Sequence, residues 1–285
     1  MPESTGLSLS EPECVPTTLV GEETLKETLG GYGKRLRFVT ESITAEFPHV
    51  QSRSIRVLDV GCGNGSWLAV PLARRGFDVT GVDLHQGSIE HACRLATGMP
   101  NARFFVGSVE DQRIGGSFDV IILSEVLEHV TDPKALLIAS LQRLQARGIA
   151  VVTVPNGYGE FEMDSWIFRA FRLKTAVSIL KYILRPRSSS GLPTDYTPDV
   201  SATDNEECGH VQFFRRRHLT RLFHDCSLAI VRESAGIFAC GPIVAHTLGH
   251  SRRFIEWNAR IADRLPIEFA SSWYFVLRRS RSSVS

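Results

Sequence analysis

Short apolar runs alternate with segments of helical periodicity over most of the chain. Apolar runs of this length predict buried strands, and apolar residues that recur every three or four positions predict helices. Because the runs are largely apolar rather than strictly alternating, they favour a mostly parallel sheet covered by helices on both faces, a doubly wound α/β fold. The expected strands span residues 57–60, 77–82, 102–107, 116–123, 148–154, 228–231 and 272–277.

Three closely spaced glycines, Gly61, Gly63 and Gly65, follow the first of these strands. Glycine permits a tight turn and a close approach to a ligand, and a helix is predicted to begin near Ser66. Amide groups and the positive end of a helix dipole at such a turn suit an anionic or carboxylate-bearing ligand. A dinucleotide fingerprint would have its third glycine at the position of Ser66, so the spacing argues against a nicotinamide cofactor.

Two carboxylates accompany the glycine turn. Asp59 lies inside the first strand, where it can fix the glycine loop or meet an ammonium group of the ligand. Asp83 ends the second strand, close to the separation of about 20 residues at which a βαβ unit delivers an acid to a ribose. A carboxylate there can accept hydrogen bonds from both ribose hydroxyls, and capping of a helix is its alternative role.

The stretch Val57-Leu58-Asp59-Val60-Gly61-Cys62-Gly63-Asn64-Gly65 resembles motif I of the class I S-adenosylmethionine-dependent methyltransferases. The resemblance implies S-adenosylmethionine as cofactor and a Rossmann-like, mostly parallel seven-stranded sheet with an antiparallel last strand. It also implies leading helices over the cofactor, from which Tyr32 or Lys34 reaches the methionine carboxylate; a solvated Lys34 is the alternative. The cofactor-binding residues expected on this basis are Asp59, Gly61, Gly63, Asn64, Gly65, Asp83, Leu84, Ser108, Val109 and Ser124.

The adenine-binding position departs from the pattern of that family. Ser108 stands where relatives often carry an aspartate, followed by a small apolar residue. A hydroxyl can accept a hydrogen bond from the adenine amine but carries no charge. Ser108 or Asp111 is therefore the expected adenine contact.

Glu125, Glu128 and His129 follow the fourth strand at a spacing that would place them on one face of a helical turn beginning at Glu125. Two carboxylates and an imidazole are plausible ligands for Mg²⁺ or Mn²⁺. This spacing resembles the ubiquinone-pathway O-methyltransferases, of the type 11/23 group, and the small-RNA 3′-terminal 2′-O-methyltransferases. The resemblance to the second of these groups implies His210 as a further ligand. A metal-free His129 or His210 acting as general base, and a purely structural role, stay open.

Composition narrows the class of protein. The net charge of +1 argues against a nucleic-acid footprint over the whole surface. The six cysteines include no Cys-x-x-Cys pair, so neither a disulfide framework nor a zinc site is indicated and a cytoplasmic location is expected. No apolar run reaches the ~18 residues of a membrane span, so we expect a soluble protein that is at most peripheral to a membrane.

The pattern divides the chain into a mobile arm (1–20), a cofactor-binding core with leading helices (21–156), an insertion or lid over the acceptor site (157–209) and the C-terminal part of the sheet (210–285). Aromatic, aliphatic and basic residues in 161–185 favour a core-packed lid or an amphipathic helix on an anionic membrane surface. The predicted activity is methyl transfer to a hydroxyl oxygen of a small-molecule, glycan or lipid-linked acceptor. RNA ribose 2′-O-methylation and non-catalytic cofactor binding are the alternatives. The sequence indicates no particular oligomeric state.

Overall fold

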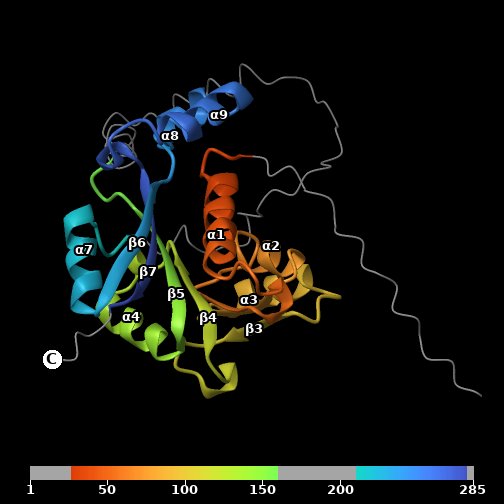
Figure 1. Ribbon diagram of the computed structural model, residues 1–285. Coiled ribbons are helices and arrows are strands. Elements are labelled where there is room, and N and C mark those ends of the chain that lie inside the picture. Colours follow the sequence, from red (N-terminus) through yellow and green to blue (C-terminus); the bar gives the residue numbers. More distant parts are fainter. Residues whose placement is uncertain (1–26, 160–209, 281–285) are drawn as a thin grey trace, which may run out of the picture.

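The computed structural model describes residues 27–159 and 210–280, and these form a seven-stranded sheet between helices (Figure 1). The strand order is β3-β2-β1-β4-β5-β7-β6, with β7 antiparallel to its neighbours β5 and β6 and the remaining pairs parallel. The predicted fold class is confirmed, including the antiparallel last strand. The strands are β1 (Arg56–Val60), β2 (Asp78–Asp83), β3 (Ala102–Val106), β4 (Phe118–Ser124), β5 (Leu144–Pro155), β6 (Leu228–Ala235) and β7 (Ser272–Arg279).

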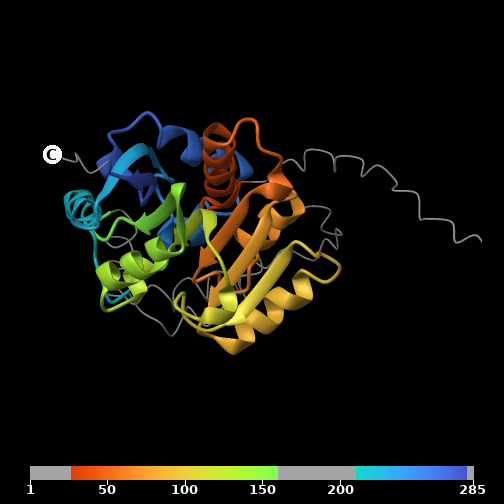
Figure 2. The ribbon, with the colours of Figure 1, turned by 60° about the horizontal axis from the view of Figure 1, so that its bottom comes forward.

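Helices cover both faces of the sheet, which twists from the β3 edge (yellow) to the β6 edge (cyan) in Figure 2. One apolar core lies between the sheet and α1, α2 and α3, and a second lies between the sheet and α4 and α7. Helices α8 and α9 lie beyond one end of the sheet, near α1, in Figure 1. The helices are α1 (Tyr32–Glu46), α2 (Ala69–Arg74), α3 (Gln86–Leu95), α4 (Pro133–Gln142), α7 (Arg216–Asp225), α8 (Pro242–Thr247) and α9 (Arg252–Ile261).

Strand β5 shows why the central strands contain apolar runs, here in residues 149–152, although residues 145–147 of the same strand are exposed. Its side chains alternate between faces, so Ile149 and Val151 enter the core under α1, while Ala150 and Val152 enter the core under α4 and α7. All four are fully buried. A strand that is buried on both faces carries no polar stripe, as the sequence pattern predicted.

The helix after the glycine turn begins at Ala69, later than the predicted start near Ser66. The delay has a local cause, because the buried Asn64 Oδ1 accepts hydrogen bonds from both the amide (3.1 Å) and the hydroxyl (2.7 Å) of Ser66. These bonds hold an Asx-type turn that competes with the helical ladder. The predicted helix end is confirmed at Gly76, whose φ of +87° is the left-handed conformation that favours glycine.

Several predictions fall on residues outside those described: the arm at 1–20, the segment 161–185 and nearly all of the insertion at 157–209. The division of the chain into four parts therefore stays a prediction. Among the described residues, no helix combines the length and the apolar character needed to cross a membrane.

Candidate active site

The three glycines form a turn that is fastened to β2. The amides of Gly61 and Cys62 both donate to the Val82 carbonyl, at 2.8 and 3.0 Å. Gly61 has a φ of +71°, and a Cβ on it would lie 2.6 Å from Val126 Cγ2, so this position has no room for a side chain. The close packing brings the turn against the residues that follow β4.

A cavity of about 330 Å³ opens beside this turn. Such a volume is typical of small-molecule sites in proteins. Five of the predicted cofactor residues line it, together with Arg35 and Glu125; these five are Asp59, Gly61, Gly63, Asn64 and Ser124. The sequence motif and the cavity therefore coincide at the carboxyl ends of β1 and β4, where open α/β sheets bind ligands.

Asp59 lies at the base of this cavity and is 3% exposed. Burial raises the pKa of its carboxyl to about 7, and the negative charge of Asp83 adds to the effect. A hydrogen bond from the Ala69 amide, the first residue of α2, opposes the rise. Asp59 thus ties the end of β1 to the start of α2, as expected for a residue that fixes the glycine loop.

Asp83 closes the turn from the neighbouring strand. Its two carboxylate oxygens accept the amides of Gly63 (2.8 Å) and His85 (2.9 Å). The alternative role as the cap of α3 belongs to His85, whose Nδ1 accepts from the Ser88 amide. Leu84 follows with 78% of its surface exposed, a large apolar area that a bound ring would cover.

The expected adenine contacts lie at the same edge, because Asp83 pairs with Val106 in the parallel register of β2 and β3. The Ser108 hydroxyl accepts from the Glu110 amide at 3.3 Å. The Val109 side chain is buried in the core under α4, and its carbonyl accepts from Arg143 Nε at 3.2 Å, which leaves its amide for a ligand. Asp111 pairs with Arg113, and their hydrogen bonds lower the pKa of Asp111 to about 2.

Arg35 is a site residue that the sequence analysis missed. It lines the cavity from α1, forms an ion pair with Glu125 (3.3 Å) and lies over the Trp67 ring, 5.3 Å from the centroid. Its buried Nε has no hydrogen-bond partner among the described residues. A buried cation with an unused donor suits a ligand carboxylate. The expected Lys34 instead donates to Ala259 O and Asp263, and Tyr32 packs edge-on against Trp67.

Glu125 does not begin a helical turn, so that prediction is wrong. Its φ of +54° is left-handed, and the short 3₁₀ turn that follows spans Leu127–His129. Besides Arg35, its carboxylate accepts from the Thr153 hydroxyl at 2.8 Å. Glu125 is therefore held toward the cofactor cavity and is absent from the set of neighbouring metal-type ligands found among the described residues.

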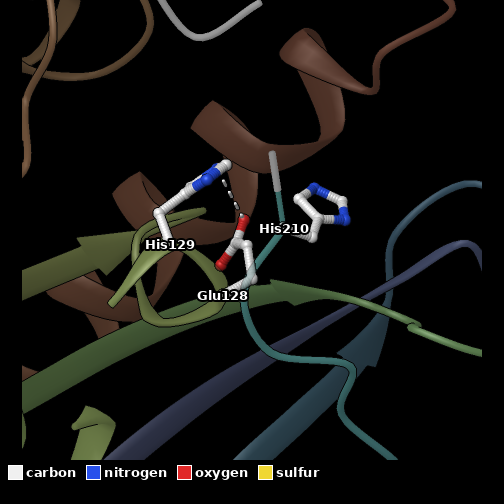
Figure 3. A group of neighbouring side chains, drawn as sticks. All are labelled: Glu128, His129 and His210. Atoms are coloured by element: carbon white, nitrogen blue, oxygen red, sulfur yellow. Dashed lines mark ion pairs between the residues drawn. The ribbon is translucent and has the colours of Figure 1, made fainter. Parts of the chain in front are cut away.

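That set consists of Glu128, His129 and His210 (Figure 3), each offering one ligand atom within 4.8 Å of the other two. His129 Nε2 lies 3.8 Å from Glu128 Oε1, and the two imidazole rings stand edge-to-face with centroids 5.3 Å apart. Figure 3 shows the rings on either side of the carboxylate. One carboxylate and two imidazoles form a donor set that suits a transition-metal ion better than Mg²⁺.

His210 reaches this cluster through main-chain hydrogen bonds. The Glu128 carbonyl accepts the amides of both Val211 (2.8 Å) and Gln212 (3.0 Å). Both bonds join the segment after His210 to the turn that carries Glu128 and His129. These backbone contacts help to set the position of His210, whose ring also packs against Phe213 with centroids 6.1 Å apart.

The Glu128 carboxyl is 1% exposed, and its Oε2 has no hydrogen-bond partner within the part of the chain that the structure describes. Burial raises its pKa well above the usual range, and the charge of Glu125 adds to the rise. A buried carboxylate of this kind is stabilised by a cation. The residues present thus fit a divalent metal ion.

The comparisons with known proteins agree with this geometry. A family model described as a methyltransferase domain matches residues 32–233. The ubiquinone biosynthesis O-methyltransferase of Rickettsia canadensis is 33% identical over 124 residues, 43% of this chain and 51% of that protein. The protein of the same name from Cereibacter sphaeroides is 38% identical over 130 residues, 43% and 52% of the two chains. This chain thus spans about half the length of the curated relatives it matches.

Solved structures share the fold. The magnesium protoporphyrin IX methyltransferase of Synechocystis PCC 6803, solved with bound SAH, superposes with a TM-score of 0.50 and 15% identity, covering 88% of this chain and 84% of that one. The family match extends over more than half of the chain, from α1 to β6. The chain therefore belongs to the methyltransferase-domain family that this model describes, and its fold is that of the class I S-adenosylmethionine-dependent methyltransferases.

Proposed function

We propose that this enzyme transfers the methyl group of S-adenosylmethionine to a hydroxyl oxygen of a small-molecule acceptor. The observation that carries the proposal is the Glu128–His129–His210 cluster, because Glu128 and His129 lie only three and four residues after the cavity-lining Glu125. Relatives at about one-third identity are named O-methyltransferases of ubiquinone biosynthesis, which supports an oxygen acceptor. A lipid-linked or glycan acceptor, membrane contact through 161–185, a cytoplasmic location and RNA as the alternative acceptor stay predictions.

The cofactor is proposed to lie along the glycine turn. Arg35 binds the methionine carboxylate, and Asp59, Gly61, Gly63 and Asn64 shape the turn around it. Asp83 accepts the ribose hydroxyls, since each of its oxygens can accept a second hydrogen bond. The remaining residues proposed to contact the adenine side or line the cavity are Gly65, Leu84, Ser108, Val109 and Ser124.

The chemistry needs a positioned acceptor and a proton acceptor. The acceptor oxygen attacks the methyl carbon in line with the sulfur, the C–S bond breaks with its electron pair on sulfur, and S-adenosylhomocysteine leaves. If the cluster holds no metal, His129 or His210 takes the hydroxyl proton. Glu128, His129 and His210 would hold a divalent ion, with Mn²⁺ favoured over Mg²⁺ by the two imidazoles. A bound ion would lower the pKa of the acceptor hydroxyl.

Calorimetric titration of Mn²⁺ and Mg²⁺ into protein saturated with S-adenosylhomocysteine tests the site. We expect saturable Mn²⁺ binding that is lost in Glu128→Gln and kept in Glu125→Gln, the matched control. Methyl transfer to a probe with two adjacent hydroxyls, such as a dihydroxybenzoate, should fall by about 10²–10⁴-fold in Glu128→Gln. If neither ion binds the wild-type protein, the cluster acts without a metal, and His129→Asn and His210→Asn then identify the base.

A further inference from the structure

A second cavity, of about 250 Å³, lies between α1, the edge strand β6 and the α9 segment. It is separate from the cofactor cavity, although α1 borders both: Lys34 lines this one and Arg35 lines the other. No residue of the proposed methyl-transfer machinery lines it. Four cationic side chains line it against two carboxylates, and they are Lys34, Arg37, Arg232 and Arg260.

Lys34 forms the buried part of this cavity. Its side chain is 10% exposed, and its Nζ donates to Asp263 (2.7 Å) and to the Ala259 carbonyl (2.9 Å). Asp263 is 54% exposed on the rim, where water weakens its hold. An anion that enters the cavity can therefore bind the Lys34 ammonium group beside the Asp263 carboxylate or displace that carboxylate.

The arginines are arranged around the opening. Arg232 is held by Glu41 (3.1 Å) and lies over the Phe38 ring, 4.8 Å from the centroid. Ser234, two residues along the same face of β6, adds a hydroxyl to the lining. Arg260 donates to an uncharged acceptor, the carbonyl of Glu256, at 3.0 Å. Arg37 forms an ion pair with Glu27 (3.7 Å), which lies outside the lining. Within the lining itself the four cations outnumber the two carboxylates.

We propose that this cavity binds a small anion that carries a phosphate group. Guanidinium groups match the oxygen geometry of phosphate, and three of them surround a buried ammonium here. If these side chains served only to hold α1, β6 and the α9 segment together through ion pairs, the lining would not need more cations than carboxylates. The proposal is independent of methyl transfer, because its residues lie outside the cofactor cavity.

The test is a titration of inorganic phosphate, followed by calorimetry at constant ionic strength, into protein saturated with S-adenosylhomocysteine. Arg260→Gln should weaken binding about tenfold. Arg253→Gln is the matched control, since Arg253 lies on the same helix, is exposed and is outside the cavity lining. We expect it to bind phosphate like the wild type, and Arg37→Gln to show a loss similar to that of Arg260→Gln. Equal affinity in all variants would overturn the proposal.

A second arm identifies the source of the phosphate group. Phosphatidylcholine vesicles with and without phosphatidic acid are sedimented with wild-type protein and with Arg260→Gln. Binding that needs both phosphatidic acid and Arg260 assigns the cavity to a lipid headgroup, and binding of inorganic phosphate alone assigns it to a free metabolite. If neither probe shows a dependence on Arg260, the cavity is not an anion site.

Discussion

The proposed cofactor side of the site, formed by the glycine turn and its cavity, and the proposed acceptor side, formed by the Glu128–His129–His210 cluster, are built in different ways. The cofactor side is local: Gly61–Gly65 turns within a few residues and is fastened to the adjacent strand by Val82 and Asp83. The acceptor side joins Glu128 and His129 to His210, which comes from a distant part of the chain. A local turn can be predicted from spacing, whereas a long-range cluster depends on the packing that joins its parts.

On the cofactor side, the buried carboxyl of Asp59 makes the stability of the protein depend on pH. The carboxyl has a pKa of 3.8 in its ordinary state and about 7 in the folded protein, so the folded protein without cofactor binds an extra proton between these values. Protonation of Asp59 therefore stabilises the folded protein. This contribution to the free energy of unfolding is fully present below about pH 4 and is lost as the pH rises through about 7. Asp59→Asn removes this dependence and keeps an oxygen for the Ala69 amide.

Urea unfolding of wild type and Asp59→Asn at about pH 4.5 and about pH 8 measures the effect. The variant should gain about 3 kcal/mol relative to the wild type on going from the lower to the higher pH. Because other titrating groups are shared, their contributions cancel in the difference. A difference in stability that does not change with pH would show that Asp59 is ionised throughout.

Much of the cofactor side was predictable from the sequence. The apolar runs, the three glycines and Asp83 are encoded locally, and the structure has the expected strands and turn. Arg35 was missed although a signal exists: it lies three residues after Tyr32, on the buried face of α1. An arginine on the apolar face of a helix is costly to bury and indicates a buried partner.

The acceptor side was less predictable. The left-handed Glu125 breaks the helical turn on which its spacing argument rested, and no periodicity reports a positive φ at a glutamate. His210 could be named only through a resemblance, because nothing near it in the sequence shows that the next two amides bind the Glu128 carbonyl. Long-range pairing of this kind becomes visible only in the folded chain.

The substitution Val211→Pro should disturb the acceptor side and leave the cofactor side intact. Val211 is 53% exposed, so its side chain contributes little packing, but its amide donates to the Glu128 carbonyl at 2.8 Å. Proline lacks that donor and also restricts the backbone of His210. Methyl transfer should fall by about 100-fold, or about 2.7 kcal/mol, as expected when a catalytic group is displaced by about 1 Å.

The control for this substitution is Val211→Ala, which keeps the amide and should retain nearly full activity. Affinity for S-adenosylhomocysteine, measured by calorimetry, should be the same in both variants, since the glycine turn is untouched. An equal loss of activity in Val211→Ala would mean that the side chain, rather than the main-chain bond, positions His210.

Arg35→Gln tests whether the cofactor side and the acceptor side bind their ligands independently. Arg35 lies between them, because it pairs with Glu125 at the end of β4. Loss of a charged hydrogen bond to the methionine carboxylate should weaken S-adenosylhomocysteine binding by about 10–30-fold, or about 1.4–2 kcal/mol. Arg37→Gln on the same helix is the control, as its side chain is 51% exposed and lies outside the cofactor cavity. Mn²⁺ binding should not weaken in either variant, since the positive charge of Arg35 acts on Glu128 and its removal would lessen the repulsion of a cation there. If Arg35→Gln weakens Mn²⁺ and S-adenosylhomocysteine binding equally, the cofactor side and the acceptor side bind their ligands as one cooperative unit rather than as two independent sites.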